Sequence, residues 1–262
     1  MSQADRVAVV IATHNSERFL EDTLASIQAQ KLRPDIHIAI DDFSTDATRT
    51  LLNDHGFEVQ AATSTARDSA TRIAQNFHQG LRAAQAAGAD IVILGDHDDL
   101  WHADRIRHQV DRLYDEPQIA MLASDGFLID EHGAAVPGTI RSTFPVPADF
   151  DSLPLRKRLA YAARHSIATG GSSALRPALM TDWSVPPGWL HDRWWSLASL
   201  RVDRFRCDTS AVIDYRVFDE QQVGLNSGDQ DSLGRWLRGK ARTLGTTAKR
   251  VRDASGLVKG SV

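Results

Sequence analysis

Three aspartates fall within four residues at Asp96, Asp98 and Asp99, directly after a short apolar run. Their charges repel, and each carboxylate raises the pKa of its neighbours. A cation removes that penalty, and Mg²⁺ or Mn²⁺ is held by one or two carboxylates together with substrate phosphates. We therefore predict a metal site with Asp98 and Asp99 as ligands, which would help a diphosphate to leave. The alternative is a solvated acidic loop in which Asp98 or Asp99 caps the next helix.

A second acidic pair, Asp41 and Asp42, follows another apolar run. Adjacent acids at the end of a buried strand cost free energy unless they serve a ligand. Carboxylates in this position can accept hydrogen bonds from a nucleobase or from ribose hydroxyls. Thr13 ends the preceding strand and is a plausible neighbour on the same ligand. Asp46, by contrast, is interpreted as a helix cap.

Asp192 is the candidate general base, a group that takes a proton from an attacking hydroxyl. It stands at the start of a predicted helix, after the break at 186–188, where it could equally be a helix N-cap. Trp189, Trp194 and Trp195 surround it in sequence. Aromatic faces can stack on sugar rings and exclude water, which would raise the carboxylate pKa. The same aromatic residues could also be ordinary core.

The spacing of apolar residues predicts the elements that position these acids. Strands are expected at 6–13, 36–40, 57–61, 91–94 and 119–123, and helices at 16–27, 46–52, 69–87 and 103–114. This alternation predicts an α/β fold, a mostly parallel sheet with helices on both faces. Ligands of such sheets bind beyond the carboxyl ends of the strands. Both acidic clusters are expected at that edge, as is Asp125 after the fifth strand.

The second half is less regular. Glycines and prolines predict a loop at 131–150, and the pair at 170–171 predicts a tight turn between short strands. Helices are expected at 153–163 and 189–200, and a last strand at 211–215. From about residue 229 the pattern is helical and basic. The tail is either a helix on an anionic membrane surface or a solvated helix against the body.

Bulk properties exclude several classes. The chain has 262 residues and a formal net charge of −4, which gives no reason to expect nucleic acid as a partner. The single cysteine, Cys207, excludes an internal disulfide and favours a cytoplasmic location, with peripheral contact at the inner face of the membrane if the tail binds lipid. We expect no signal peptide and no membrane-spanning segment, because no sufficiently long apolar run occurs.

Taken together, these motifs resemble family 2 glycosyltransferases, and in particular their rhamnosyltransferase-like branch. The resemblance extends over about residues 6–224, which would form one domain with a donor half at 1–130 and an acceptor half at 131–224, before a tail at 225–262. The matching segments follow family order: 7–15, 41–48, 75–77, 95–101, 124–125, 170–171, 191–195 and 215–224. The order of these segments along the chain makes the match more specific than any one motif.

The resemblance implies a GT-A (Rossmann-like) fold, Mg²⁺ or Mn²⁺ as cofactor, and transfer with inversion from a nucleoside-diphosphate sugar of the dTDP or UDP type. The acceptor would be a hydroxyl of a glycan or lipid-linked molecule in surface polysaccharide synthesis, and rhamnose is the sugar that the branch suggests. The roles it implies are nucleoside binding by Thr13 and Asp41 or Asp42, ribose contact by Asp96, metal binding by Asp98, and base catalysis by Asp192.

One departure concerns the closing segment, where the branch usually shows Tyr-Arg-X-His. Here Phe218 stands at the histidine position, and Asp219 follows it. If that histidine holds the metal or the diphosphate in the branch, this chain must use Asp219, a water or nothing. The departure bears on donor preference.

Two other classes remain open. A metal-dependent nucleotidyltransferase acting on sugar phosphates also places aspartate pairs at strand ends. It usually carries a glycine-rich phosphate loop with Lys or Arg after the first strand, and residues 13–16 offer none. A non-catalytic sugar-binding module would not need a metal motif and a separate base together.

Overall fold

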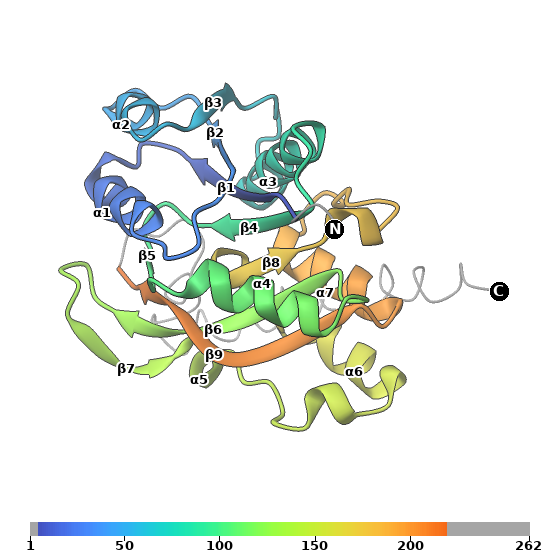
Figure 1. Ribbon diagram of the computed structural model, residues 1–262. Helices are drawn as coiled ribbons and strands as arrows, with labels where there is room; N and C mark the ends of the chain where they lie inside the picture. The colour runs from blue at the N-terminus through green and yellow to red at the C-terminus, as the bar shows by residue number, and fades with distance from the viewer. Residues whose placement is uncertain (1–4, 219–262) are drawn as a thin grey trace, which may run out of the picture.

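The first half of the chain alternates strands and helices in the computed structural model, which describes residues 5–218 (Figure 1). Its strands are β1 (Val7–Thr13), β2 (Ile36–Asp41), β3 (Glu58–Ala61), β4 (Ile91–Gly95) and the short β5 (Leu100–Trp101). Its helices are α1 (Glu17–Gln28), α2 (Thr48–Asp54), α3 (Ser69–Ala86) and α4 (Arg105–Asp115). The α/β prediction is confirmed here, and β5 is the element that the sequence pattern did not predict.

The second half is built from longer-range pairings. Its strands are β6 (Met121–Ile129), β7 (Ala135–Thr139), β8 (Ser173–Leu175) and β9 (Phe205–Arg216). Its α-helices are α5 (Ile140–Thr143), α6 (Leu155–Ala162) and α7 (His191–Arg201). Short 3₁₀ turns are η1 (Phe150–Ser152), η2 (Gly170–Ser172) and η3 (Pro177–Leu179).

Several expectations for this half are wrong. The strand expected at 119–123 continues to Ile129, so Asp125 lies within β6 rather than after it, and no strand directly precedes the turn at 170–171. The loop predicted at 131–150 contains β7 and α5, because the chain turns back at Gly133 and pairs with β6 as a hairpin. The last strand begins at Phe205 rather than at residue 211, because its first residues pair with Met121 and its neighbours in β6. Both elements owe their form to pairing between distant segments, which local spacing does not record.

One mixed sheet joins the two halves. Its order is β3-β2-β1-β4-β8-β6-β9-β5, with β7 beside β6. Strands β1 to β4 pair in parallel, whereas β8 is antiparallel to both of its neighbours. Helices α1, α2 and α4 cover one face, and α3, α6 and α7 cover the other (Figure 1).

The residues of β1 show why the strand forms at the centre of the sheet. Val7, Val9 and Ile11 face one hydrophobic core, whereas Ala8 and Val10 face the other. All five are 4% exposed or less. Burying each aliphatic side chain is worth about 2 kcal/mol. A strand apolar on both sides is stable only between two helical layers.

The direction of β8 determines where the turn before it, η2, lies. Because β8 is antiparallel to β4, its first residue lies near the carboxyl end of β4. The turn η2, which precedes β8, is therefore carried to the edge where β1, β2 and β4 end. This turn, although distant in sequence, thus lies beside the loop at residues 96–99.

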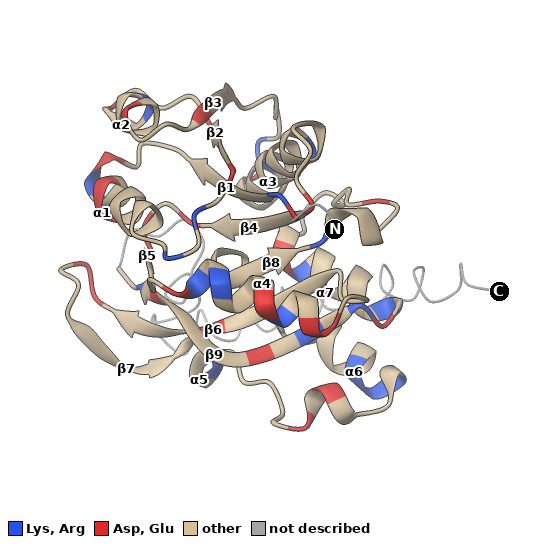
Figure 2. Ribbon diagram, in the orientation of Figure 1, with Lys and Arg blue, Asp and Glu red and all other residues tan. Residues whose placement is uncertain are grey.

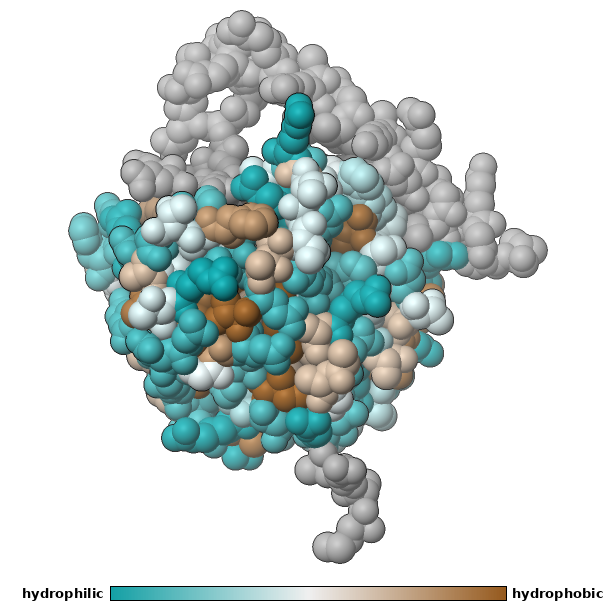
Figure 3. Space-filling model, turned by 90° about the horizontal axis from the view of Figure 1, so that it is seen from above, coloured by the Kyte–Doolittle hydropathy of each residue, from teal (hydrophilic) through white to brown (hydrophobic). Residues whose placement is uncertain are grey.

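The outer surface shows no extended apolar area on the side seen from above. Hydrophobic residues form small patches scattered among hydrophilic ones on this face (Figure 3). Within residues 5–218, no helix has the length and apolar character needed to cross a bilayer. The basic tail predicted at 225–262 lies outside the described residues, as do Asp219 and Gly224.

Candidate active site

Strand ends bring the predicted acids to one edge of the sheet. Thr13 ends β1 and pairs in register with Asp41, the last residue of β2. Asp96 follows Gly95 at the end of β4, which is the other neighbour of β1. Parallel strands end on the same side, so the acids after β2 and β4 flank the end of β1. This arrangement agrees with the predicted placement beyond the strand ends.

The nucleoside-side pair, Asp41 and Asp42, is held by cations from two helices. Thr13 Oγ1 donates to Asp41 Oδ1 at 3.3 Å, and Arg49 Nη1 lies 3.5 Å from Asp41 Oδ2. The guanidinium Nε of Arg72, on α3, lies 2.7 Å from Asp42 Oδ2. Asp41 is fully buried and Asp42 is 7% exposed. Each acid therefore has a basic partner within the protein.

The loops after β1 and β2 are tied to each other. Asn15 N donates to Ser44 Oγ, and Thr45 N donates to Asn15 Oδ1, both at 2.9 Å. Asn15 and Phe43 have φ values of 48° and 56°, in the left-handed region that a bulky residue rarely adopts. Phe43 is nevertheless 64% exposed. Strain of this kind persists where surrounding contacts over-determine the backbone, which is common at binding sites.

In the metal-side cluster, formed by Asp96, Asp98 and Asp99, two of the carboxyls have raised pKa values. The pKa of Asp96 is raised to about 7, first by burial and then by repulsion from Asp98 and Asp192. Burial and repulsion from Asp98 and Asp96 also raise the pKa of Asp99 well above its ordinary value. These carboxyls resist ionising together, so charge from a ligand would stabilise their ionised forms.

The residues fit a divalent cation only in part. Asp99 is fully enclosed: its Oδ1 accepts from Arg216 N at 3.1 Å, and its Oδ2 is buried without a hydrogen-bond partner. Asp98 is 6% exposed and lies between Asp96 and Asp99 in sequence. Among residues 5–218, no three side chains of the ligating types are grouped to hold a metal by themselves. That fits Mg²⁺ or Mn²⁺ bound by one or two carboxylates plus phosphate oxygens, and it favours Asp98 over Asp99 as ligand.

A buried arginine lies beneath the metal-side cluster. Arg105 is 1% exposed, its guanidinium lies 3.7 Å from the centre of the Trp101 ring, and its Nη2 donates to Leu94 O. Burial lowers the pKa of Arg105 to about 9, while the charges of Asp99 and Asp96 act in the opposite direction. It remains protonated at neutral pH. Both basic and acidic residues lie along α4 (Figure 2). Arg105, which is buried, supplies positive charge to the interior.

The candidate base, Asp192, lies in the first turn of α7 rather than at its N-cap, which is Leu190. Its Oδ1 accepts from Arg193 N at 2.6 Å. The pKa of Asp192 is raised to about 6, because the effect of burial exceeds the opposing effects of Arg193 and of the backbone N–H of Gly170. A carboxyl with this pKa is mostly ionised at neutral pH and is still basic enough to accept a proton.

Tyr215 shows that the two acidic segments converge. This residue of β9 is 8% exposed, and burial raises the pKa of its phenol well above the ordinary value. The same pKa is raised further by four carboxylates, in decreasing order Asp99, Asp96, Asp98 and Asp192. Such effects fall off with distance, so the metal-side cluster and the candidate base lie within electrostatic range of one side chain.

The tryptophans near Asp192 do not form an open sugar platform. Trp195 is fully buried, and its Nε1 donates to Trp183 O at 2.7 Å. Trp189 is 4% exposed and packs edge to face against Trp194. The interpretation of Trp189 and Trp195 as sugar-stacking residues is therefore wrong, because both side chains are buried in the hydrophobic core. Trp194 keeps partial exposure.

Phe218 takes the place of the branch histidine in sequence and packs against α1. Its ring lies 5.0 Å from the ring of Phe19, centre to centre, and that ring also faces the guanidinium of Arg216. Arg216 Nε donates to Asp98 O at 2.9 Å. The closing segment thus reaches the backbone of the metal-side loop through an arginine.

A pocket of about 540 Å³ lies next to this contact. Its lining residues are Arg18, Phe19, Asp22, Ala25, Leu100, Glu131, His132, Gly133 and Arg216. Of the described residues that line it, none is a predicted donor, metal or base residue. The pocket borders the metal-side loop but does not contain the carboxylates.

Several site residues escaped the sequence analysis. Arg105 and Gln109 occupy core-facing positions of α4, four residues apart and on the same side as Ile106 and Val110. Polar residues on an apolar helix face are the signal that could have revealed them. Arg72 left no comparable signal, because its partner is distant in sequence. Tyr215 entered the sequence analysis only as part of the closing segment, with no role assigned to it.

A family model described as glycosyl transferase family 2 matches residues 8–159, more than half of the chain. The comparison with curated proteins gives no match.

Solved structures with the same fold include enzymes that bind nucleotide sugars. S. aureus TarS 1–349 in complex with UDP has 18% identity and a TM-score of 0.56, covering 82% of this chain and 61% of that one. Mycobacterium tuberculosis glucosyl-3-phosphoglycerate synthase with Mn²⁺ and UDP has 19% identity and a TM-score of 0.56, covering 93% and 80%. Mannosyltransferase PcManGT from Pyrobaculum calidifontis with GDP-Man and Mn²⁺ has 18% identity and a TM-score of 0.55, covering 96% and 65%.

These likenesses confirm the fold, a GT-A arrangement with a mixed α/β sheet. The chain spans about three fifths of the TarS fragment.

Proposed function

Because the chain belongs to glycosyl transferase family 2, we propose that it transfers a sugar from a nucleoside-diphosphate donor to an acceptor hydroxyl with inversion. The observation that carries this proposal is that Gly170 and Gly171, adjacent in one turn, lie against His191, next to Asp192, and against Asp96 and Asp99. Asp96, Asp98 and Asp192 also all raise the pKa of Tyr215. This arrangement supplies a cation-binding group and a base of suitable pKa within one site. A sugar diphosphate held between them could react on one face and leave on the other.

The donor nucleoside would lie over the ends of β1 and β2. In this proposal Asp41 or Asp42 accepts hydrogen bonds from the base, Thr13 lies beside it and Asp96 contacts the ribose. Asp41 is buried and bonded within the protein, so it would act mainly by fixing the loop, and Asp42 is the better candidate for direct contact. Arg72 would keep the Asp42 carboxylate ionised and oriented.

Asp98 would hold Mg²⁺ or Mn²⁺ together with diphosphate oxygens, and Asp99 would support its loop from the interior. When bound, the ion would neutralise charge on the departing diphosphate. The Mn²⁺ in the solved structures of the mycobacterial synthase and PcManGT supports this choice of cofactor.

Asp192 would act as the general base. The acceptor hydroxyl gives its proton to the Asp192 carboxylate while its oxygen forms a bond to the anomeric carbon. The bond from that carbon to the diphosphate oxygen breaks, and its electron pair leaves with the nucleoside diphosphate. Attack opposite the leaving group inverts the anomeric carbon. The partly buried site raises the basicity that this step needs.

Residues 131–224 would bind the acceptor, and residues 1–130 the donor. We propose a glycan or lipid-linked acceptor in surface polysaccharide synthesis, and a cytoplasmic enzyme that touches the inner membrane face if the tail at 225–262 binds lipid. The rhamnosyltransferase-like branch adds a finer proposal, rhamnose from a dTDP donor. UDP-linked sugars are the alternative within the same chemistry.

A two-step experiment tests the function. Nucleotide sugars carrying UDP, dTDP or GDP are first screened with Mn²⁺ by thermal shift, because a true donor at a hundred times its Kd stabilises the folded state by about 2.7 kcal/mol. The best donor is then incubated with the enzyme. Release of nucleoside diphosphate supports glycosyl transfer, whereas pyrophosphate would indicate a nucleotidyltransferase and absence of turnover a binding module.

Asp192→Asn is the matched variant for the base. It keeps the size of the side chain and removes its basicity, so donor binding should persist while transfer falls by on the order of 10²-fold or more. Unchanged turnover would remove Asp192 from the mechanism.

A further inference from the structure

The double-glycine turn at Gly170 and Gly171 contacts both halves of the proposed site. The backbone N–H of Gly170 acts on the carboxylate of Asp192 and lowers its pKa, and that of Gly171 acts in the same way on the carboxylate of Asp96. Two successive N–H groups of one turn are thus divided between the base and the metal-side cluster. The carboxylates come from α7 and from the loop after β4, which are far apart in sequence.

Neither glycine has room for a side chain, and each is enclosed by a different group. A Cβ on Gly170 would lie 2.5 Å from His191 Nε2, the residue before Asp192. A Cβ on Gly171 would lie 2.6 Å from Asp96 Oδ2 and 2.7 Å from Asp99 Oδ2. These distances are shorter than real contacts, so an added methyl group would displace what it meets. One glycine is packed against the base side and the other against the metal side.

His191 makes the base side rigid. It is 4% exposed, its ring stacks on Phe77 with centres 3.9 Å apart, and it packs edge to face on Trp195. Both ring nitrogens are buried without a hydrogen-bond partner, and burial lowers the pKa of this histidine to about 3. A neutral ring in this position serves packing. Its displacement would shift the first turn of α7 and Asp192 with it.

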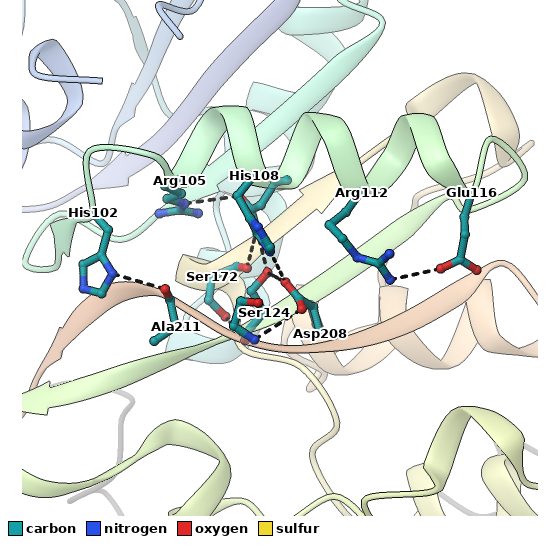
Figure 4. Close-up of polar contacts among 12 residues, drawn as sticks. His102, Arg105, His108, Arg112, Glu116, Ser124, Ser172, Asp208 and Ala211 are labelled. Atoms are coloured by element: carbon teal, nitrogen blue, oxygen red, sulfur yellow. Dashed lines mark hydrogen bonds and ion pairs between the residues drawn. The ribbon is translucent and has the colours of Figure 1, made fainter. Parts of the chain in front are cut away.

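The turn is also supported from below by α4. Gln109 Nε2 donates to Ser172 O at 2.8 Å and to Ser124 Oγ at 3.2 Å (Figure 4). Ser172 Oγ donates to Ser124 O at 2.9 Å. Ser124 Oγ in turn donates to Asp208, which pairs with His108. This network fixes the last residue of the turn to β6, β9 and α4.

We propose that the Gly170–Gly171 turn is a positioning element that sets the separation between the base and the metal-side carboxylates, with one backbone N–H directed to each. The inference rests on the proposed function, because it assigns the two carboxylates to base and metal chemistry. Gly171 acts through Asp96 and Asp99, and Gly170 acts through Asp192 and His191. The same one-carbon change at the two positions should therefore have different effects.

The test compares Gly170→Ala with Gly171→Ala. Mn²⁺ binding is measured with UDP present, from the electron paramagnetic resonance signal of free Mn²⁺, and release of nucleoside diphosphate gives kcat and KM. Gly171→Ala should weaken Mn²⁺ binding tenfold or more. Gly170→Ala should leave Mn²⁺ binding within twofold of wild type and lower kcat tenfold or more. Gly56→Asn is the control and should change neither quantity, because Gly56 is exposed, an added Cβ there meets nothing within 4 Å, and asparagine tolerates its φ of 76°.

A rescue variant separates positioning from general damage. His191→Ala removes the atoms that a Cβ on Gly170 would meet, so Gly170→Ala with His191→Ala should have the kcat of His191→Ala alone. In the double variant of Gly171→Ala with His191→Ala, Mn²⁺ binding should stay as weak as in Gly171→Ala alone. If either alanine variant fails to fold, Gln109→Met gives the answer without adding bulk to the turn. It removes the hydrogen bond to Ser172 and should lower both Mn²⁺ affinity and kcat severalfold.

Two results would overturn the role of the turn: equal loss of Mn²⁺ binding in both glycine variants, or wild-type values of both quantities in Gln109→Met. Failure of the proposed function has a different signature. Wild-type protein would then show no Mn²⁺-dependent binding of any donor in the screen, or no release of nucleoside diphosphate.

Discussion

The two acidic clusters differ in how the protein compensates their charge. Asp41 and Asp42 have arginine partners, with Arg49 at 3.5 Å and Arg72 at 2.7 Å. The metal-side cluster lies near two buried arginines, Arg105 and Arg216, and Arg216 contacts it through its backbone N–H and through the carbonyl of Asp98. The pKa values of Asp96 and Asp99 are raised by burial and by repulsion from neighbouring carboxylates. This difference supports the proposal that a divalent cation would bind at the metal-side cluster rather than at Asp41 and Asp42.

The largest expected effect comes from removing the proposed metal ligand. Asp98→Ala should weaken Mn²⁺-dependent donor binding by on the order of 100-fold or more, since even groups behind a metal ligand contribute 10- to 100-fold. Calorimetric titration of the donor, with and without Mn²⁺, measures this. A variant that keeps the metal dependence of the wild type would show that the two clusters do not differ as described.

The next effect concerns one of the two buried arginines. Arg105→Met should lower the free energy of unfolding by about 3 kcal/mol, because the change leaves buried acids without their counter-charge. The matched change at the other cluster is Arg49→Ala. Arg49 is about half exposed, so the loss there should be below about 1 kcal/mol. Urea denaturation gives both values, and similar losses in the two variants would contradict the comparison.

The pH dependence of transfer should follow Asp192. The base must be ionised, and its pKa is about 6, so kcat/KM should rise with pH through 6 and be about tenfold lower at pH 5 than on the plateau. Stability should change in the opposite direction. Because the folded-state pKa is raised, protonated Asp192 favours the folded state at low pH, and that contribution is lost as pH rises from about 4 to about 6. Asp192→Asn should remove this part of the pH dependence of Tm, and an unchanged profile would argue against it.

The smallest expected effect is at the nucleoside side. Asp42→Asn should weaken donor binding severalfold, about the value of one hydrogen bond to a charged group, and leave the dependence on Mn²⁺ unaltered. Arg72→Gln should have a similar effect, because it leaves the carboxylate without its partner. Donor titrations at several Mn²⁺ concentrations would show whether the nucleoside side acts independently of the metal.

The first half of the fold could be predicted closely because its signals are local. Apolar runs such as 7–11 are buried on both sides, and the apolar positions of α1 and α3 repeat at helical spacing. Parallel strands then place Asp41 and Asp96 at one edge. The short β5 could not be predicted, because its two residues become a strand only by pairing with Ile213 and Asp214.

The second half could not be predicted to the same degree because long-range pairing shapes it. Strand β8 has three residues and depends on β4 and β6, and the turn before it meets Asp96 only through that pairing. Trp195 gave an ambiguous signal, since a sugar platform and a core residue require the same aromatic side chain. Its complete burial decides for the core.

The short strand β5 also has a consequence for the order in which the protein matures. The loop at 96–99 is anchored on one side by β4 and on the other by Leu100 and Trp101, which pair with β9, the last described strand. During synthesis β1 to β4 can assemble while β9 is still unmade. The nascent chain therefore cannot anchor both sides of its metal-side loop until β9 has been synthesised.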